Sequence, residues 1–294
     1  MIPLIKLDPG AAANASDTSN LTRRVWSALV LAPIGVAAAY LGGWLFVLIC
    51  AAAAVIMLWE WTQLVVRSPD LRILVPGIAV LLAATLLAGE NQAGAAVGMI
   101  VIGAALVGGV MAAWPRRYPA SDPALWAGSG VIYAGIAMVS PVVLRSDPEY
   151  GFTALLFLFG TVWATDIFAY LTGRAIGGPL LWPQLSPGKT WAGAVGGLLG
   201  GVAAGTAVAY ASGGTSPAAA AILAVVLSVA GQSGDLFESA IKRRFGVKDA
   251  GNLIPGHGGV MDRLDGFLVA ALVAVFIGVA HGGVAAPGRG LLVW

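Results

Sequence analysis

The fold is decided by long apolar stretches, of which residues 44–66, WLFVLICAAAAVIMLWEWTQLVV, are a clear example. Glu60 is the one charged residue in this stretch. A helix needs about 20 mostly apolar residues to cross the hydrocarbon core of a bilayer, and this stretch is long enough. It therefore predicts a membrane-spanning helix.

Outward from this stretch, the same pattern recurs along the chain. The predicted spans are 25–42, 44–66, 73–89, 93–114, 126–144, 151–173, 191–211, 217–237 and 266–285. The first span lacks the pattern of a cleavable signal peptide. Residues 1–24 precede it, and their composition predicts a disordered cytoplasmic N-terminal tail. The sequence thus predicts an all-α, polytopic membrane helix bundle of about nine transmembrane helices.

The composition agrees with a membrane protein. Of the 294 residues, 59% are hydrophobic and 10% are charged, whereas soluble domains carry about 25% charged residues. The single cysteine, Cys50, excludes a disulfide framework, and the two histidines argue against a multi-histidine zinc site. A formal net charge of +2 gives no reason to expect nucleic-acid binding.

The basic residues predict the orientation of the bundle. If the N-terminus is cytoplasmic, all of the 16 lysines and arginines except Arg145 and Arg289 fall on the cytoplasmic side. Cytoplasmic loops of membrane proteins are enriched in Lys and Arg. We therefore expect an N-in/C-out protein of the bacterial inner membrane.

Polar residues divide the chain into two predicted regions. Residues 25–145 contain the N-terminal transmembrane helices, with few polar groups inside the spans, and residues 146–294 form a C-terminal transmembrane catalytic region. The two long segments of this second region, 174–190 and 238–265, fall on the predicted cytoplasmic side. We therefore expect the active site to face the cytoplasm.

Glycines follow one another at four-residue spacing in the span 191–211, at positions 193, 197, 201 and 205. This spacing places them on one helical stripe, where two helix backbones can approach closely. The stripe predicts tight helix packing, either within the subunit or between subunits, so a homodimer is left open.

The end of the eighth predicted span carries a dense polar run, GDLFESAIKRR, over residues 234–244. On a helix, Asp235, Ser239 and Lys242 share one face. A carboxylate in lipid is costly, so Asp235 is expected to face protein, water or a cation. An ion pair with Lys242 or Arg243 explains Asp235 equally well.

The next segment, 245–265, reads FGVKDAGNLIPGHGGVMDRLD. Its run PGHGG cannot form a regular helix, and backbone amides in such a loop can approach phosphate oxygens. Lys248, His257 and Arg263 supply further donors beside the loop.

Asp262 and Asp265 open the last predicted span, three residues apart on one helical face. Each carboxylate alone could be a simple complement to the helix dipole. Carboxylates gathered with basic groups and a glycine-rich loop indicate more, because Mg²⁺ prefers oxygen ligands that it shares with substrate phosphates. The basic groups would then balance the remaining phosphate charge.

Two further motifs lie upstream. In Ser186-Pro187-Gly188-Lys189-Thr190-Trp191, Lys189 is flanked by two hydroxyl residues, and the glycine spacing of a P-loop is absent, so an interfacial anchor is the alternative. Asp166 lies inside the sixth span, where an ionisable residue is a functional candidate by default. A buried hydrogen bond to Tyr170 or Thr172 is an almost equally good explanation of Asp166.

Taken together, these motifs resemble the signature of the phosphatidate cytidylyltransferase (CDP-diacylglycerol synthase) family. The matching pattern is Ser239-x-Ile241-Lys242-Arg243, Lys248-Asp249, and Pro255-x-His257-Gly258-Gly259-Val260-x-Asp262-Arg263-x-Asp265. Residues 186–191 resemble a second family motif, and Asp166-x-x-Ala169-Tyr170 resembles a third. The family often has a glutamate two residues after the Trp of the second motif, but Ala192-Gly193 follow here, so no carboxylate role is expected there.

The resemblance implies that the phosphate of phosphatidate attacks the α-phosphorus of CTP and that pyrophosphate leaves. It also implies Mg²⁺ held by Asp235 and Asp262, with a second cation left open. The predicted catalytic residues are Asp235, Asp262, Lys242, Arg243, His257 and Arg263. The predicted substrate- and phosphate-binding residues are Ser186, Lys189, Thr190, Ser239, Lys248, Gly258, Gly259 and Asp166.

Two other classes of protein are alternatives to this function. A transporter of an anionic solute would place its binding site near the membrane midplane, whereas the charged motifs here gather at the predicted cytoplasmic end. A CTP-dependent enzyme acting on another membrane lipid, such as a polyprenol kinase or an ether-lipid cytidylyltransferase, is the alternative. The motif density disfavours the kinase, but nothing in it distinguishes acyl from ether chains.

Overall fold

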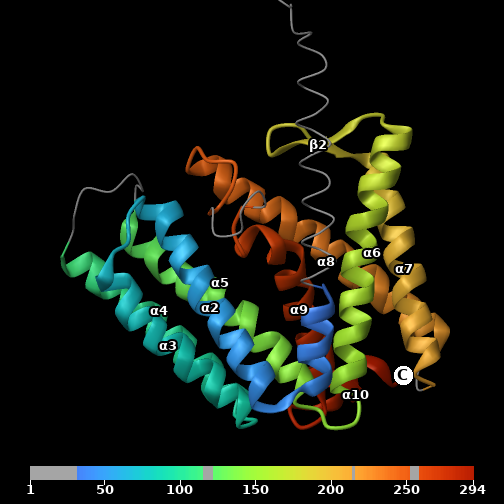
Figure 1. Ribbon diagram of the computed structural model, residues 1–294, viewed down its shortest axis with the longest axis horizontal. Coiled ribbons are helices and arrows are strands. Elements are labelled where there is room, and N and C mark those ends of the chain that lie inside the picture. Colours follow the sequence, from blue (N-terminus) through green and yellow to red (C-terminus); the bar gives the residue numbers. More distant parts are fainter. Residues whose placement is uncertain (1–31, 115–121, 214–215, 252–257) are drawn as a thin grey trace, which may run out of the picture.

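The computed structural model describes residues 32–114, 122–213, 216–251 and 258–294, and this part of the chain is a helical bundle with one small hairpin (Figure 1). Its eight long helices are all apolar enough to cross a membrane. They are α2 (Gly43–Val66), α3 (Leu71–Gly89), α4 (Ala93–Ala113), α5 (Pro123–Arg145), α6 (Gly151–Ile176), α7 (Trp191–Ala211), α8 (Pro217–Arg244) and α9 (Met261–Gly282). The predicted all-α membrane bundle is confirmed.

The first predicted span, 25–42, is described only in part. Its described residues form a short apolar helix, Ala32–Leu41. The predicted N-terminal tail, residues 1–24, lies outside the described residues. The other eight predicted spans therefore correspond to long helices, and the first predicted span corresponds to this shorter helix.

Two helices extend furthest beyond their predicted spans. The span 217–237 is part of α8, which continues to Arg244, and the span 266–285 is part of α9, which begins at Met261. The extra turns carry the polar residues of the two signature runs. Hydropathy detects only the apolar part of a helix, so it ends each span where the charged residues begin.

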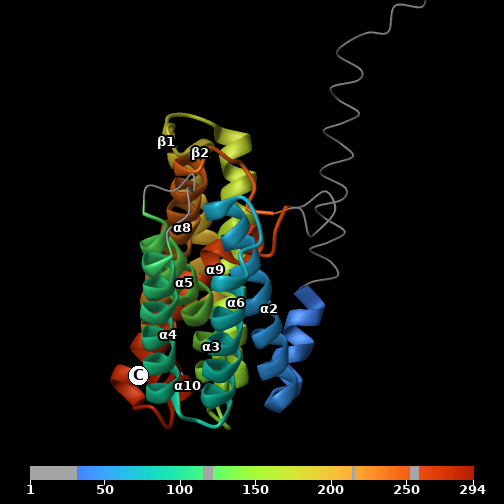
Figure 2. The ribbon, with the colours of Figure 1, turned by 90° about the vertical axis from the view of Figure 1, so that its left-hand side faces the viewer.

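Two elements were not predicted. A two-stranded antiparallel hairpin, β1 (Leu180–Trp182) and β2 (Ser186–Thr190), joins α6 to α7. A short helix, α10 (Pro287–Leu292), follows α9. In Figure 1 the hairpin and the C-terminal end of α8 lie at one end of the bundle, while α10 and the C-terminus lie at the other; Figure 2 shows the same separation. The described residues of the two long predicted cytoplasmic segments therefore share one end of the bundle.

The glycine stripe of α7 packs against α6. A Cβ atom at Gly193, Gly197 or Gly201 would lie 2.8, 2.7 or 2.9 Å from the carbonyl oxygens of Ala169, Thr165 and Thr161, respectively. Only residues without a side chain allow two helix backbones to approach this closely. The stripe is thus used within the subunit, which was one of the two predicted uses.

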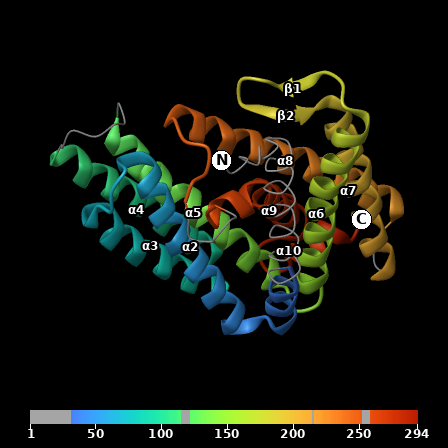
Figure 3. The same ribbon diagram turned by 45° about the horizontal axis from the view of Figure 1, so that its top comes forward.

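The helices fall into two groups with α9 between them. Figure 3 shows α2–α5 on one side, α6 and α7 on the other, and α8 crossing the middle next to α9. The first group has an apolar core in which Met57, Leu58, Leu81 and Ile100 are buried to 1% exposure or less. Because α9 contacts α5 as well as α6 and α8, it connects this core to the helices that carry the signature motifs.

Candidate active site

A polar cavity of about 580 Å³ lies at the hairpin end of the bundle. The elements that line it are α6, the β1–β2 hairpin, α7, α8 and the first turn of α9. Its lining residues are Asp166, Ala169, Tyr170, Gly173, Arg174, Leu181, Gly188, Lys189, Thr190, Gly193, Ala194, Gln232, Asp235 and Arg263. Five predicted site residues therefore meet here: Asp166, Lys189, Thr190, Asp235 and Arg263.

The hairpin brings Lys189 to Asp235. Thr190 ends β2 and begins α7, and its hydroxyl oxygen accepts a hydrogen bond from the Gly193 amide at 3.0 Å, as an N-cap residue does. The preceding residue, Lys189, places its Nζ atom 3.0 Å from Oδ2 of Asp235. The ion partner of Asp235 is thus Lys189, not Lys242 or Arg243.

Asp166 faces the same cavity from α6, within electrostatic reach of Asp235 and Lys189. The Tyr170 hydroxyl receives a hydrogen bond from Arg174 at 2.8 Å, and Thr172 donates to the Phe168 carbonyl at 2.7 Å. Neither hydroxyl group bonds to Asp166, so the predicted alternative for Asp166 is not what the structure shows. Arg174 was not among the predicted site residues, although it lines the cavity.

A second group of charges, Glu238, Lys242 and Asp262, lies deeper in the protein. Lys242 Nζ is 2.9 Å from Glu238 Oε1 and 2.7 Å from Asp262 Oδ1. Glu238 is fully buried and the Asp262 side chain is 7% exposed. We call these three residues the carboxylate–lysine cluster. Lys242 offsets the charge of both carboxylates, which burial would otherwise penalise.

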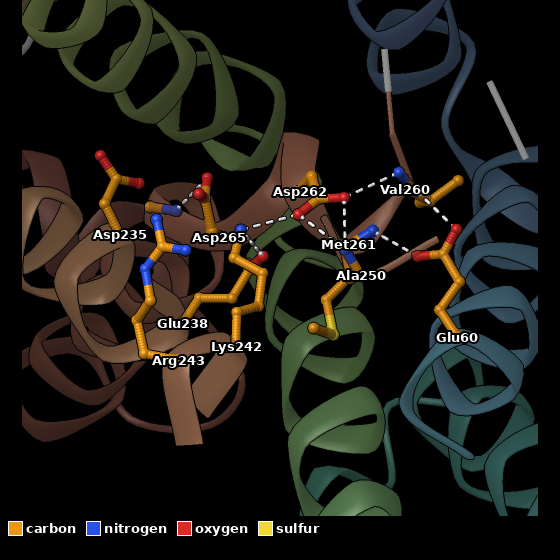
Figure 4. A network of polar contacts seen from close by, with 12 residues as sticks. Glu60, Asp235, Glu238, Lys242, Arg243, Ala250, Val260, Met261, Asp262 and Asp265 are labelled. Atoms are coloured by element: carbon orange, nitrogen blue, oxygen red, sulfur yellow. Dashed lines mark hydrogen bonds and ion pairs between the residues drawn. The ribbon is translucent and has the colours of Figure 1, made fainter. Parts of the chain in front are cut away.

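Asp262 also holds the backbone of the signature loop. Its Oδ2 atom accepts hydrogen bonds from the Ala250 amide at 2.9 Å and from the Gly259 amide at 2.8 Å (Figure 4). Gly258 has a φ of +82°, a conformation that glycine adopts easily, and a Cβ atom there would lie 2.6 Å from Asp262 Oδ2. Asp262 thereby joins the residues on both sides of 252–257. The predicted site residue His257 lies outside the described residues.

Glu60 is a site-adjacent residue that the motifs did not reveal. It comes from α2, is fully buried, and accepts hydrogen bonds from the Val260 amide at 2.8 Å and from the Met261 amide at 2.7 Å. Figure 4 shows it on the opposite side of the loop from the carboxylate–lysine cluster. The sequence feature that could have identified Glu60 is its position as the one charged residue in an apolar span.

Asp265 lies on α9 between the two groups of charges (Figure 4). It accepts a hydrogen bond from the Gly266 amide at 2.9 Å and is within electrostatic reach of Asp235 and Glu238. A Cβ atom at Gly266 would lie 2.7 Å from Asp235 Oδ1, so α8 and α9 approach closely at this level. Asp265 therefore links the cavity to the carboxylate–lysine cluster.

The remaining predicted residues surround this centre. Arg243 donates from Nε to the Leu185 carbonyl at 3.3 Å, which connects the end of α8 to the hairpin. Ser186 and Ser239 are half-buried, on β2 and α8 respectively. Lys248 is exposed on the loop after α8. These residues lie around the cavity end, and Ser239 is one helical turn after Asp235 on α8.

The donor set fits a hard divalent cation. In the part of the chain that the structure describes, no group of three or more Asp, Glu, His or Cys side chains is arranged to hold a metal by itself. Mg²⁺ commonly binds through one or two carboxylates and completes its coordination with water and substrate phosphates. Asp235, close to Asp166 and Asp265, provides such oxygen ligands. Nucleotidyl transfer generally uses a divalent cation to offset phosphate charge.

Comparison with known proteins identifies the family. Residues 22–280 match the model of the cytidylyltransferase family. The phosphatidate cytidylyltransferase of Brucella abortus is 40% identical over 261 residues, which cover 88% of this chain and 94% of that protein. The protein of the same name from Haemophilus influenzae is 34% identical over 275 residues, covering 85% and 96% of the two chains.

A third relative matches only in part. The phosphatidate cytidylyltransferase of Bacillus subtilis is 39% identical over 138 residues, which cover 47% of this chain and 51% of that protein. The family match, in contrast, extends over the N-terminal helices as well as the helices that carry the cavity. The chain therefore belongs to the cytidylyltransferase family and is a multi-pass membrane enzyme that uses CTP.

Proposed function

We propose that this enzyme transfers CMP from CTP to phosphatidate, producing CDP-diacylglycerol and pyrophosphate for phospholipid biosynthesis. The observation that carries the proposal is the Lys189–Asp235 pair, at 3.0 Å, in a polar cavity at one end of a membrane bundle. A carboxylate beside a lysine suits a metal-bound triphosphate, and the names of the relatives supply the lipid acceptor.

The reaction is a substitution at phosphorus. An oxygen of the phosphatidate phosphate forms a bond to the α-phosphorus of CTP, and the bond from that phosphorus to the bridging oxygen of the β-phosphate breaks. Negative charge develops on the leaving pyrophosphate. Lys189 and Arg263, which both line the cavity, are placed to offset this charge.

The other predicted residues take supporting roles in the proposal. Lys248 and the hydroxyl groups of Ser186, Thr190 and Ser239 are proposed to contact phosphate oxygens. Gly258 and Gly259 would do so only when the Gly259 amide leaves Asp262, to which it is bonded at 2.8 Å in this structure. Lys242 and Arg243, at the end of α8, contribute positive charge at the same end of the bundle, and His257 is a further donor. Asp166 contributes a second carboxylate, beside Asp235, to the cavity wall.

Asp235 and Asp262 are the proposed Mg²⁺ ligands, and the bound cation would offset charge on the phosphates during transfer. Asp262 Oδ1 is bonded to Lys242 at 2.7 Å, so coordination through this atom requires Lys242 to withdraw. Glu238, at 2.9 Å, can retain Lys242 when it does so. Asp265, between the two aspartates, is the residue best placed to substitute for Asp262.

The lipid is proposed to reach the cavity from the bilayer alongside α6. Ile167, Phe168 and Leu171 are 56%, 46% and 51% exposed on this helix, next to the cavity residues Asp166 and Tyr170. Apolar side chains facing outward match the acyl chains of a lipid whose phosphate enters a polar cavity. The cavity end is proposed to face the cytoplasm of a bacterial inner membrane, where CTP is available. A homodimer stays a prediction, because the glycine stripe that suggested it packs within the subunit.

The test is an assay of purified protein with CTP, Mg²⁺ and one lipid at a time, in which either the α- or the γ-phosphate of CTP is radiolabelled. We expect α-label, and no γ-label, to enter the lipid phase when phosphatidate is present. Transfer of γ-label to polyprenol would show a kinase instead. Strong preference for an ether-linked phosphatidate analogue would assign the enzyme to ether lipids.

A further inference from the structure

The loop that carries Asp262 is held from two sides by two carboxylates. Asp262 itself accepts from the Ala250 and Gly259 amides. Glu60, 200 residues away in sequence, accepts from the Val260 amide, and also from the amide of Met261. The amides of three successive residues, 259 to 261, are therefore divided between these two side chains.

The burial of Glu60 is explained by these contacts. A buried carboxylate is costly unless hydrogen bonds and positive charge compensate for it. The first amides of a helix have no partner within the helix and carry partial positive charge. Glu60 meets the first turn of α9 at this point, with distances of 2.8 and 2.7 Å. Both of its oxygen atoms are used in holding α9.

The surrounding backbone is shaped to the Glu60 carboxylate. A Cβ atom at Gly251 would lie 3.1 Å from Glu60 Oε1, and a Cβ atom at Gly259 would lie 2.5 Å from Oε2. A side chain at either glycine would push the loop away from Glu60. The loop sequence and the carboxylate of α2 are therefore matched to each other.

The residues that follow these amides belong to the proposed active site. Asp262 comes directly after Met261, and Arg263, which lines the cavity, is the next residue. A change in the start of α9 would shift both side chains relative to Asp235 and Lys189. In contrast, Glu60 does not itself line the cavity.

We propose that Glu60 is a positioning residue for nucleotidyl transfer, which acts by fixing the start of α9 and thereby the placement of Asp262 and Arg263. The inference rests on the proposed function. It also gives the N-terminal helices a part in the reaction, because α2 supplies the group that holds the catalytic loop.

The test is Glu60→Gln in the full-length protein. Glutamine has nearly the same size, but it offers one acceptor oxygen to two amide donors and brings an NH₂ group against the other. We expect kcat to fall by about 10- to 100-fold, as for other groups that orient an active-site ligand. Hydrogen exchange should rise at residues 258–266, while the melting temperature changes little.

Thr62→Val is the matched control. Thr62 lies two residues further along α2, is 1% exposed, and donates its hydroxyl hydrogen to the Leu58 carbonyl of its own helix at 2.8 Å. Its hydroxyl group bonds within α2 instead of to α9, so its replacement should leave kcat and the exchange of residues 258–266 unchanged. Glu60→Asp, which retains the charge but is shorter, should restore part of the activity lost in Glu60→Gln.

Two outcomes would overturn the inference. Wild-type kcat in Glu60→Gln would show that the contact does not matter for the reaction. Loss of kcat together with faster exchange throughout the bundle would show that Glu60 only supports folding. The proposed function fails separately, if the wild-type enzyme transfers no α-label to phosphatidate, and in that case the exchange measurement still tests the contact.

Discussion

The two groups of helices use polar side chains in different ways. In α2–α5, buried hydroxyl groups bond back to their own helix: Thr62 to Leu58, Thr85 to Leu81, and Ser140 to Ile136, all at 2.7–2.8 Å. The Trp61 indole of α2 donates to the Trp126 carbonyl of α5 at 2.8 Å, which is a bond between helices in this group. In the C-terminal group some hydroxyl groups also bond within their helix, such as Thr161 to Phe157 at 2.8 Å, but charged and hydroxyl groups bond between helices as well. Thr165 of α6 donates to Ser228 of α8 at 2.8 Å, and Lys189, Lys242 and their carboxylates connect the hairpin, α8 and α9.

This difference separates a scaffold from a site. A polar group that bonds within its own helix places no constraint on neighbouring helices, whereas a bond between helices fixes their relative position. The N-terminal group reaches the site through only a few polar contacts among the described residues. Examples are the hydrogen bond that Glu60 accepts from the Val260 amide and the hydrogen bond that Arg67 donates to the Phe245 carbonyl at 3.1 Å.

The largest effects are expected at the aspartates of the C-terminal group. Asp235→Asn and Asp262→Asn retain the size of the side chain but remove a charge that the cation needs. We expect each to lower kcat by about 100- to 1,000-fold, the loss typical of a group that stabilises transition-state charge. The double variant should be little worse than either single variant, because groups that act as a unit are not additive. Turnover is measured across a Mg²⁺ titration, with the melting temperature of each variant.

The control for this prediction comes from the N-terminal group. Asp122 caps α5 by accepting from the Leu125 amide at 3.1 Å, and Asn is equally suited to that role, so Asp122→Asn should leave turnover unchanged.

Asp265→Asn tests which aspartate is the second Mg²⁺ ligand. If it raises the Mg²⁺ requirement more than Asp262→Asn does, Asp265 is the partner of Asp235. Well-folded, active Asp235 variants with normal Mg²⁺ dependence would contradict the metal site altogether.

The next largest effects are expected at the basic residues of the cavity. Lys189→Ala and Arg263→Ala should lower kcat by about 10- to 100-fold. The loss of kcat is expected to be smaller than for a fully enclosed hydrogen-bond donor, because the Lys189 side chain is 34% exposed. Stability should change by less than about 1 kcal/mol in Lys189→Ala, as for other partly exposed ion pairs. Steady-state kinetics with CTP and thermal melting measure both effects.

Arg244 provides the comparison for this pair. It is also a basic residue at the hairpin end of the bundle, but its guanidinium lies 5.3 Å from the centre of the Trp126 ring instead of in the cavity. Arg244→Ala should therefore retain most of the wild-type kcat. Equal losses in Arg244→Ala and Lys189→Ala would mean that general positive charge, not a phosphate contact, is required.

The helices were well predicted from sequence, because membrane spans depend on length and apolarity, which are local properties. The span 191–211 agrees with α7 at both ends. The motifs also predicted that Asp235 and Lys189 lie at the same end of the bundle, and the two side chains meet there at 3.0 Å. Contacts between distant segments were not predicted: the hairpin that delivers Lys189 to Asp235 is too short and polar for a clear strand pattern. The Glu60 contact spans 200 residues and depends on backbone amides, which no side-chain motif encodes.

A smaller effect, on stability, tests the packing difference between the two groups. A Cβ atom at Gly201 of α7 would overlap the Thr165 hydroxyl and lie 2.9 Å from the Thr161 carbonyl oxygen, whereas at Gly98 of α4 it would meet no atom within 4 Å. Gly201→Ala should therefore destabilise the protein by about 1–3 kcal/mol. Gly98→Ala should be neutral or slightly stabilising, because alanine favours the helix. Thermal melting in detergent compares the two variants, and equal melting temperatures would contradict close α6–α7 packing.

The smallest effect on activity is expected from reporters that test the orientation of the bundle. The charge distribution predicts N-in/C-out, and the hairpin that lines the cavity lies at the end of the bundle opposite to the C-terminus (Figure 1). The two statements together require a cytoplasmic cavity and an external C-terminus. A reporter that is active only outside the cytoplasm should therefore be active when it is fused after Trp294. A reporter that is active only in the cytoplasm should be active when it is inserted within 112–124. Turnover should be retained in the C-terminal fusion, since Trp294 is 55% exposed and remote from the cavity. A cytoplasmic C-terminus would place the cavity outside, away from CTP, and would contradict both the predicted count of spans and the proposed reaction.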